Sequence, residues 1–385
     1  HEAPACHLRR RRPDLSAIRF LEERDLPVVA TMMHRVLRNG NGGAPAGLEG
    51  YMRSFYLEGP GCGDDLRSLV HVDDSDTVSG FLGVHVLPMI YGDRRLRGAI
   101  ASSLMVEKGN RDPMAGARLM KAFVNGPQDL SFSETANRTS TQMWTRLRAV
   151  PVPQYSLDWV RIIRPSSFVV GMASKRIGLA GIFRPVASAV DRFYRKRLPA
   201  GKVQWASTPA GGLSLPGMRA SEIGPDSFTK LLEPLTAHFG LRPRWAEMPV
   251  DRMLKDSASK PDQGDLVLAG VTAPNGAPVG AFAYYPQKGS MARVMQVLAR
   301  PGQEGAVIDC LTDHAAARGV AALRGRSQPA LMTAMLTRRI AFLPATNTIV
   351  HSRDPALLEA MLGGQAFLNG LAGEEWSRLI GGRFD

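Results

Sequence analysis

The sequence predicts an α/β (α+β) protein with two similar domains, each a mixed, mostly antiparallel sheet flanked by helices. Three observations support this fold class. Strand-like and helix-like hydrophobic periodicities alternate over residues 16–165. The same order recurs over residues 218–385, and two copies of one topology are the simplest explanation of that repeat. Between them, residues 166–217 are predicted to be a basic helical linker.

The first domain is predicted to have the order β-α-(α)-β-β-β-α-β-α-β. Its first strand is Ile18–Phe20, and a helix with apolar residues from Val29 to Leu37 follows. The glycine-rich stretch Asn39–Gly50 predicts a loop. The remaining elements are strands at Leu66–Val72, Val78–Ile90 and Arg97–Val106, a helix at about Met114–Phe123, a strand at Leu130–Glu134, a helix at about Thr139–Leu147 and a strand at Gln154–Ile163.

The second domain repeats this order. Asn275-Gly276, between two apolar runs, predicts a tight hairpin turn. The predicted elements are a strand at Met218–Glu222, helices at Asp226–His238 and Asp251–Lys255, strands at Leu266–Thr272, Val279–Tyr284 and Val294–Ala299, a helix at Gly305–Arg318, a strand at Ala321–Gly325, a helix at Leu331–Ile340 and a strand at Thr348–Val350.

The charge balance favours anionic partners. Lys+Arg 48 and Asp+Glu 35 leave a formal net charge of +13 at pH 7. Such a charge attracts nucleic acid, an anionic membrane surface or a phosphate-rich small molecule. Basic patches with interleaved aromatic residues are sparse, so we expect no specific nucleic-acid partner. No apolar run has the length of a membrane-spanning helix.

Cysteine and histidine usage indicates a cytoplasmic protein without a metal. Cys6, Cys62 and Cys310 are few and far apart, which predicts free thiols in a reducing compartment. No HxxxH or HExxH spacing is present, so we expect no metal site. Residues 1–13 contain arginines without an apolar stretch behind them, so no secretory leader is expected.

The segment 161–202 contains ten Lys/Arg residues and a single acid, Asp191. Val186, Val190 and Phe193 recur within it at helical spacing, which predicts an amphipathic helix. One interpretation is a helix packed on the domains with a solvated basic face. The alternative is docking to an anionic membrane, which would make the protein peripheral at the inner face of that membrane.

The most informative motif lies between the strand that ends at Val106 and the helix that starts near Pro113 to Ala115. A proline is tolerated in the first turn of a helix because its missing N–H would have no intrahelical partner there. The free N–H groups and the dipole of a helix start suit a diphosphate. Arg111 adds positive charge and Gly116 permits close approach of the ligand.

This motif, read as Arg111-Asp112-Pro113-Met114-Ala115-Gly116-Ala117 with Leu119 beyond, resembles the acyl-CoA pyrophosphate loop of the GNAT acyltransferase superfamily. A second signature agrees: a strand, Asn137, and then the helix Thr139–Leu147. In the family this asparagine and helix flank the pantetheine and thiol end of the cofactor. The resemblance covers 16–165 and, more weakly, 218–385. It implies two GNAT-like domains, as in the tandem-GNAT proteins found with polysaccharide biosynthesis enzymes.

Three residues depart from the family pattern. Met114 occupies the position of the first loop glycine, which narrows the approach of the diphosphate to the backbone. Trp144 stands where many members carry a tyrosine that protonates the leaving thiolate, and an indole N–H does not do this at neutral pH. In the second half, Glu304 in the loop Arg300–Ala306 would repel a diphosphate. The donor site is therefore expected in the first domain, and the second domain is expected to be degenerate.

The resemblance implies direct attack of an amine or hydroxyl on a bound thioester. Backbone N–H groups of Leu104, Met105 and Val106 would polarise the carbonyl. Glu107 and Glu134, at the ends of two strands, are the candidate general bases. His85, on an alternating strand, is interpreted as a core histidine.

These inferences predict an acyltransferase that uses acetyl-CoA or another acyl-CoA as cosubstrate. Its acceptor is expected to be an amino sugar or a saccharide precursor. Two alternatives stay open. The Fem-type peptidoglycan transferases also pair two GNAT folds but use aminoacyl-tRNA, and a degenerate GNAT pair would serve as a membrane-associated binding module.

Overall fold

Residues 17–59, 63, 65–73, 75–107, 109–110, 112–174 and 184–384 are described by the computed structural model. Within them the chain divides into two units. The first comprises the chain up to His85 together with Ala101–Pro127. The second comprises Val86–Ile100 together with Gln128–Phe384. The two longest strands of the first half, β3 (Val78–Tyr91) and β4 (Arg94–Val106), run through both units.

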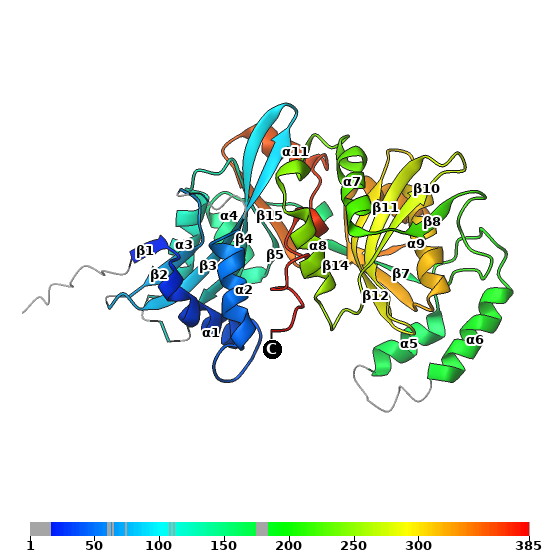
Figure 1. Ribbon diagram of the computed structural model, residues 1–385, viewed down its shortest axis with the longest axis horizontal. Helices are drawn as coiled ribbons and strands as arrows, with labels where there is room; N and C mark the ends of the chain where they lie inside the picture. Colours follow the sequence, from blue (N-terminus) through cyan, green and yellow to red (C-terminus); the bar gives the residue numbers. More distant parts are fainter. Residues whose placement is uncertain are drawn as a thin grey trace, which may run out of the picture. The chain divides into compact units, whose positions relative to one another are not determined.

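The first unit contains the neighbouring strands β1, β2, β3 and β4, with antiparallel ladders joining β1 to β2 and β2 to β3. Helix α3 packs against β1 and β2 (Figure 1). Its elements, besides β3 and β4, are β1 (Ala17–Phe20), the 3-10 turn η1 (Glu23–Asp25), α1 (Leu26–Val36), α2 (Ala46–Tyr56), β2 (Leu69–Val72) and α3 (Ala115–Val124).

The loop predicted at Asn39–Gly50 is wrong in its second part, because α2 begins at Ala46. Leu48, Met52 and Tyr56 are buried at a spacing of four residues, so one helical face enters the core. Two glycines within α2 obscured that periodicity, since glycine is a poor helix former.

The second unit contains most of the helices and the whole of a second sheet. Its elements are β5 (Leu130–Ala136), α4 (Arg138–Arg146), β6 (Val150–Pro151), η2 (Pro153–Tyr155), β7 (Leu157–Ile162), α5 (Pro165–Ser174), α6 (Arg184–Lys196), β8 (Arg219–Glu222), α7 (Pro225–Thr236), β9 (Leu241–Pro243), η4 (Trp245–Glu247), α8 (Val250–Ala258), β10 (Val267–Thr272), β11 (Pro278–Tyr285), β12 (Met291–Ala299), α9 (Glu304–Ala317), β13 (Ala322–Arg326), α10 (Pro329–Thr337), β14 (Ala341–Pro344), β15 (Asn347–Ser352), α11 (Pro355–Leu362) and η5 (Gly370–Ala372).

The second unit shows a reciprocal exchange of strands between the two halves of the chain. Strand β15, from the second half, lies between β5 and β6 and is antiparallel to both. Strand β7, from the first half, lies between β13 and β14 and is antiparallel to both. The second sheet has the order β14-β7-β13-β12-β11-β10-β8. The limits predicted for the two domains stay a prediction.

Both sheets are mixed, and the predicted fold class is confirmed. β4 runs parallel to β5 over Gly98–Ile100, and β12 runs parallel to β13 over Met291–Val294. The other ladders of the described residues are antiparallel. Helices α7 and α9 pack against the second sheet.

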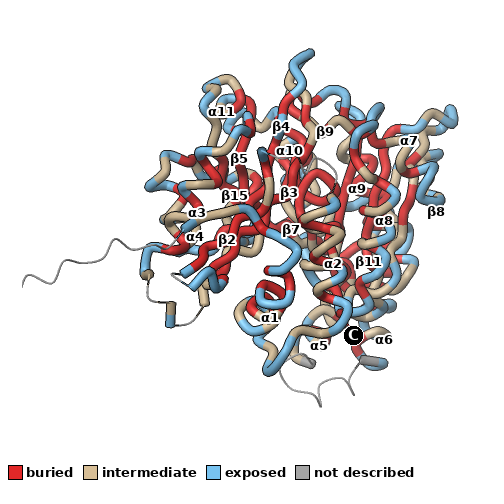
Figure 2. Tube along the Cα trace, turned by 60° about the vertical axis from the view of Figure 1, so that its left-hand side comes forward, coloured by how far each residue is buried: buried red, intermediate tan, exposed pale blue. Residues whose placement is uncertain are grey.

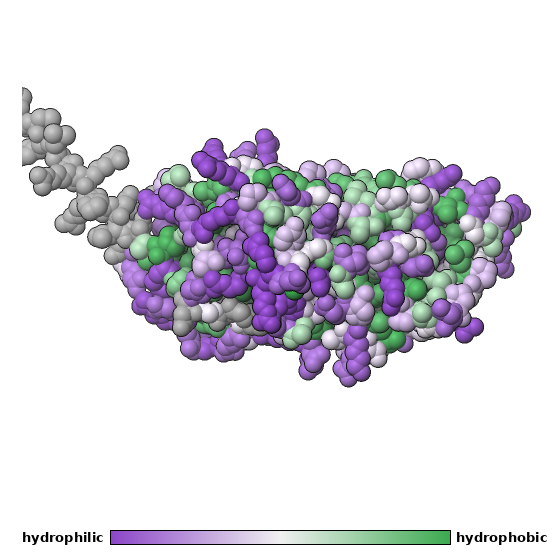
Figure 3. Space-filling view, turned by 90° about the horizontal axis from the view of Figure 1, so that it is seen from above, coloured by the Kyte–Doolittle hydropathy of each residue, from purple (hydrophilic) through white to green (hydrophobic). Residues whose placement is uncertain are grey.

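Buried residues lie in both strands and helices, as the red segments of Figure 2 show. In the second sheet, Phe282 and Val294 are buried against Val307 and Leu311 of α9, within a continuous apolar core. On the face shown in Figure 3, by contrast, apolar side chains are scattered among hydrophilic ones. Burial of apolar side chains in a core such as that of the second sheet is the main favourable term in the free energy of folding.

Three short elements of the second half were absent from the sequence prediction. β9 pairs with β3 through Leu241–Pro243. β14 and α11 were also not expected. Each has fewer than nine residues, so the hydrophobic period has little length over which to show.

Candidate active site

The loop that follows β4 leads into the N-terminus of α3, as predicted. The Glu107 N–H donates to the Ser79 carbonyl at 2.9 Å and keeps the loop start against β3. Asp112 then organises the turn: its N–H donates to Asn110 Oδ1 at 2.9 Å, and its Oδ1 accepts from the Met114 N–H at 2.8 Å. Arg111 lies outside the described residues. The sequence therefore forms a strand, a tight polar turn and a helix start in the order that a diphosphate site needs.

The first turn of α3 retains donors for an anion. The Ala115 N–H donates to the Asp112 carbonyl at 3.2 Å, and the Arg118 N–H donates to the Met114 carbonyl at 2.8 Å. No backbone bond to a described residue involves the N–H groups of Gly116 and Ala117, which is the ordinary condition of a helix start.

Met114, at the position of the missing glycine, is 54% exposed. Its side chain therefore points away from the core. Ala115 and Gly116 are buried where α3 meets the strands.

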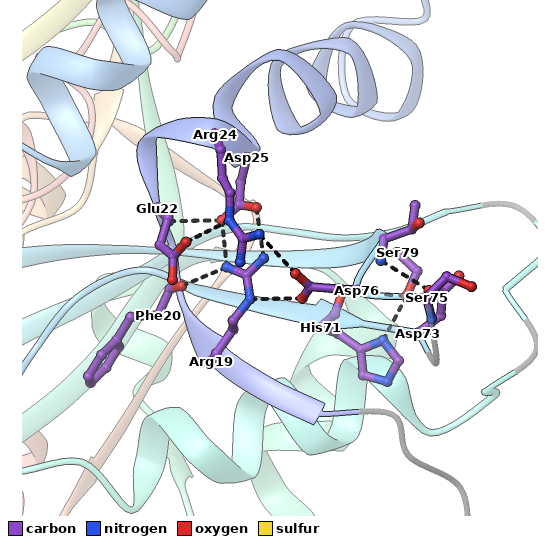
Figure 4. Close-up of polar contacts among 11 residues, drawn as sticks. Arg19, Phe20, Glu22, Arg24, Asp25, His71, Asp73, Ser75, Asp76 and Ser79 are labelled. Atoms are coloured by element: carbon purple, nitrogen blue, oxygen red, sulfur yellow. Dashed lines mark hydrogen bonds and ion pairs between the residues drawn. The ribbon is translucent and has the colours of Figure 1, made fainter.

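Asp112 also brings a negative charge to this helix start. Its Oδ2 lies 3.1 Å from Nε2 of the buried His71 and 3.3 Å from Nε of Arg118. His71 Nδ1 in turn lies 2.7 Å from Ser79 Oγ, a contact drawn in Figure 4. The carboxylate thus links the loop to β2 and β3. Its negative charge would also repel a ligand anion at this helix start.

The outer edge of the first unit is fixed by a second polar cluster, also shown in Figure 4. Arg19 of β1 donates to both oxygens of the buried Asp25, at 2.7 and 2.9 Å. Its Nε donates to Asp76 at 3.4 Å. This bidentate pair joins β1 to the start of α1.

The end of β4 departs from ordinary strand geometry close to the predicted oxyanion donors. Ser103 has a φ of 52°, in the left-handed region. Consecutive strand residues point to opposite faces, yet the Oγ atoms of Ser102 and Ser103 lie 3.2 and 3.3 Å from the same Tyr56 hydroxyl. Such local irregularities re-aim a strand and occur often beside active sites. Leu104, Met105 and Val106 follow directly, with Met105 buried and the other two half-buried.

The two candidate bases lie in different surroundings. Glu107, in the first unit, forms an ion pair with Arg35 of α1 at 3.0 Å and is partly exposed. Glu134, in the second unit, is buried. Its two carboxylate oxygens accept the N–H groups of Asn369 at 2.9 Å and of Glu374 at 3.1 Å. Burial raises the pKa of Glu134 above its usual range, so this carboxylate is both an anchor of the C-terminal segment and a group poised to hold a proton.

Asn137 and Trp144 both belong to α4, in the second unit. The Asn137 side chain accepts the Ser140 N–H at 2.9 Å and caps the helix. Trp144 is buried in the core. Their predicted contact with the cofactor stays a prediction.

The loop of the second half is closed by its own side chains. The Gly302 N–H donates to the Glu304 carboxylate at 3.0 Å, so a carboxylate already holds one of the donors that a diphosphate would use. The ladder of β12 with β13 ends at Val294. Beyond that point the segment around η5 (Gly370–Ala372) packs against β12. The Leu371 N–H donates to Gln296 Oε1 at 3.0 Å. A Cβ on Gly370 would lie only 2.5 Å from the Met295 carbonyl oxygen. The location of the donor site in the first half stays a prediction.

Three residues of interest were not expected from the sequence. Tyr56 lies in α2, to which the prediction gave no residue range. Lys260 and Arg326 line a cavity with the candidate base Glu134, and no sequence motif connects these distant positions. Among the described residues, no group of three or more His, Cys, Asp or Glu side chains could hold a metal ion, and no helix is both long and apolar enough to cross a membrane.

Sequence comparison and structure comparison give different results for this chain. No family model matches the sequence, and no curated protein is significantly similar to it in sequence.

Solved structures do resemble it. One is a conserved protein of unknown function from Enterococcus faecalis V583, described as a probable N-acyltransferase (TM-score 0.55, 8% identity, 91% of this chain and 74% of that one). Another is a GCN5-related N-acetyltransferase from Anabaena variabilis ATCC 29413 (TM-score 0.56, 10% identity, 88% and 73%). A third is a GCN5-related N-acetyltransferase from Kribbella flavida (TM-score 0.53, 14% identity, 89% and 72%). The chain therefore has the fold of the GCN5-related N-acetyltransferases.

Proposed function

We propose that the protein is an acyl-CoA-dependent N- or O-acyltransferase whose donor binds at the loop between β4 and α3. The observation that carries this proposal is the helix start itself. The Gly116 and Ala117 N–H groups have no backbone partner among the described residues, and they follow a strand whose end is irregular at Ser103. The likeness of the fold to N-acetyltransferase structures supports the same function.

When bound, acyl-CoA would supply the thioester that the acceptor attacks. The chain's own contributions would be three. The α3 N-terminus holds the diphosphate, N–H groups of Leu104–Val106 polarise the carbonyl, and the carboxylate of Glu107, in the same unit, takes the proton of the acceptor. An amino sugar or saccharide precursor remains the proposed acceptor class.

Calorimetric titration with acetyl-CoA tests this proposal. We expect binding in the micromolar range by the wild type, and its loss in Arg111→Glu, because the substitution places a carboxylate beside the diphosphate. Lys230→Glu, the same charge reversal at an exposed site of α7, is the matched control and should bind like the wild type. Absence of binding by the wild type would favour an aminoacyl-tRNA donor or a binding module without catalysis.

We further propose that α5 and α6 dock onto an anionic membrane. Helix α6 is packed with its polar side inward: Asp191 and Arg195 are buried, whereas Val190 and Phe193 are exposed. The buried Asp191 accepts the Ser167 N–H at 2.7 Å. Large apolar side chains exposed on the two helices are Val169, Met172, Val186, Val190 and Phe193.

Residues of α5 and α6 help to line a basic cavity of about 580 Å³. No carboxylate is among the described residues that line it. Its cations are Arg164, Arg192, Arg195, Lys196, Lys288 and Arg318. Apolar side chains with flanking cations are the combination by which interfacial helices bind anionic lipid.

Co-sedimentation with vesicles tests the membrane contact. We expect the protein to sediment with vesicles containing phosphatidylserine and not with pure phosphatidylcholine, and Phe193→Glu to lower the bound fraction. Leu362→Glu, at an exposed leucine of α11, is the control. Sedimentation that is independent of anionic lipid would contradict the proposal. Dimerisation lost in Phe193→Glu would assign this face to a second copy of the chain.

A further inference from the structure

A cavity of about 340 Å³ in the second unit is lined by four cations and two carboxylates. The two carboxylates are Glu134, at the end of β5, and Glu375, in the C-terminal segment. The four cations are Lys260, Arg293, Arg324 and Arg326. The cavity therefore has an excess of positive charge. How much of that charge is left for a ligand depends on which cations already form ion pairs within the protein.

Two of the cations are neutralised within the protein. Arg293 forms ion pairs with Glu375 and, at 3.5 Å, with Asp158. Arg324 forms an ion pair with the same Asp158 at 2.6 Å. These two arginines thus share two carboxylates, and their charge is satisfied locally.

The other two cations have only neutral partners among the described residues. The Lys260 ammonium, in a residue that is 3% exposed, donates to the Glu375 carbonyl. Arg326 donates to the Glu134 carbonyl at 2.9 Å and to oxygens of Thr346 and Thr348. The described ion pairs do not include Lys260 or Arg326, although the carboxylates of Glu375 and Glu134 act on them at longer range. Burying a charge without a counter-charge is costly.

Two further atoms point to a ligand. Arg326, which lines the cavity, has a buried Nε with no hydrogen-bond partner among the described residues, so one of its donors is unused. Asn369 Oδ1 is likewise buried without a partner, so an acceptor is unused as well. Buried polar atoms are nearly always bonded, and exceptions call for an explanation. A molecule with an oxyanion and a neighbouring O–H or N–H group would satisfy both.

We propose that this cavity binds a small molecule through a carboxylate or phosphate group held by Lys260 and Arg326. The ammonium and the guanidinium supply charge-assisted hydrogen bonds to the oxyanion, and the Asn369 carbonyl oxygen accepts from a hydroxyl or amine of the same molecule. Binding in this cavity is independent of acyl-CoA. Its test does not depend on whether the protein is an acyltransferase.

Isothermal titration of the full chain with methyl phosphate and with acetate, in the absence of acyl-CoA, tests the proposal. We expect saturable binding of at least one of the two, and the stronger binder identifies the oxyanion. Lys260→Gln keeps a donor for the Glu375 carbonyl and removes the charge, and it should weaken binding about tenfold, the loss of one charge-assisted contact. Arg326→Gln should do the same.

An exposed cation outside both basic cavities supplies the matched control. Lys230→Gln removes such a cation from α7 and should leave the binding unchanged. If Arg326→Gln does not fold, Lys260→Gln decides the question alone, because its side chain makes a single hydrogen bond to the described residues. No binding by the wild type, full binding by Lys260→Gln, or loss of binding in Lys230→Gln would each overturn the proposal.

Discussion

Replacing Glu134 by glutamine should release the segment Asn369–Glu374 from the end of β5. The carboxylate accepts two backbone N–H groups of that segment, whereas the oxygen of an amide accepts one and its NH₂ group faces the other. One charge-assisted bond is therefore lost, at ~1.5–3 kcal/mol. Because burial already disfavours the ionised form, we take the lower part of that range, about 2 kcal/mol. This corresponds to an equilibrium constant for opening of the segment that is about 30-fold larger than in the wild type.

Hydrogen exchange read by mass spectrometry measures this opening directly. We expect peptides that contain Asn369 and Glu374 to lose about 30-fold in protection, and peptides from α9 to change little. Glu107→Gln is the matched control, since its partly exposed ion pair with Arg35 should be worth ~0–1 kcal/mol. Unchanged protection of the segment in Glu134→Gln would refute the assignment of Glu134 as its anchor.

The raised pKa of Glu134 adds a test with a definite sign. A group whose pKa is higher in the folded state contributes stability at low pH that is lost as the pH rises through the folded value. The free energy of unfolding of the wild type should therefore fall, relative to Glu134→Gln, as the pH rises from the ordinary carboxyl value of 4.5. Urea titrations of both proteins across that range measure the difference.

Three further changes have defined outcomes. Tyr56→Phe should lower the free energy of unfolding by about 1 kcal/mol in urea, because the hydroxyl that meets Ser102 and Ser103 is lost; no change would mean that the contact does not hold β4. Asp112→Asn keeps an oxygen for the Met114 N–H and removes a charge that repels a diphosphate, so calorimetry should show acetyl-CoA binding about three- to tenfold tighter. Burial lowers the pKa of Lys260 from 10.5 to about 8, so wild-type stability should rise between pH 8 and 10.5 relative to Lys260→Gln, and parallel curves would contradict the burial of that charge.

The sequence was sufficient to predict the elements with a long hydrophobic period. The helices at Leu26–Val36 and Glu304–Ala317 and the long strands β3 and β4 all appear close to their predicted positions. Their apolar residues recur over several turns or pleats, so each segment carries its own signal. Helix α2 entered the predicted order only as an optional second helix without a residue range, because its start is glycine-rich, although its buried face is regular.

The candidate site was predictable only where it is contiguous in the sequence. The loop between Val106 and Ala115 could be recognised because strand, turn and helix start follow one another. The contact of Tyr56 with Ser102 spans 46 residues, and that of Glu134 with Asn369 spans 235. Pairs of this kind depend on tertiary packing, and no local pattern in a single sequence records them.

The exchange of β7 and β15 has a consequence for how the chain reaches its native state. β7 can be completed only by β13 and β14, which lie more than 150 residues later, and β15 must return to β5. Contacts of such high sequence separation slow folding, because a long loop must close before the strands gain their hydrogen bonds. Neither sheet can be completed while only the first half of the chain has been synthesised. Until the last strand leaves the ribosome, β5 has an open edge that could pair with another nascent chain, so the protein should depend on chaperones that shield exposed strands.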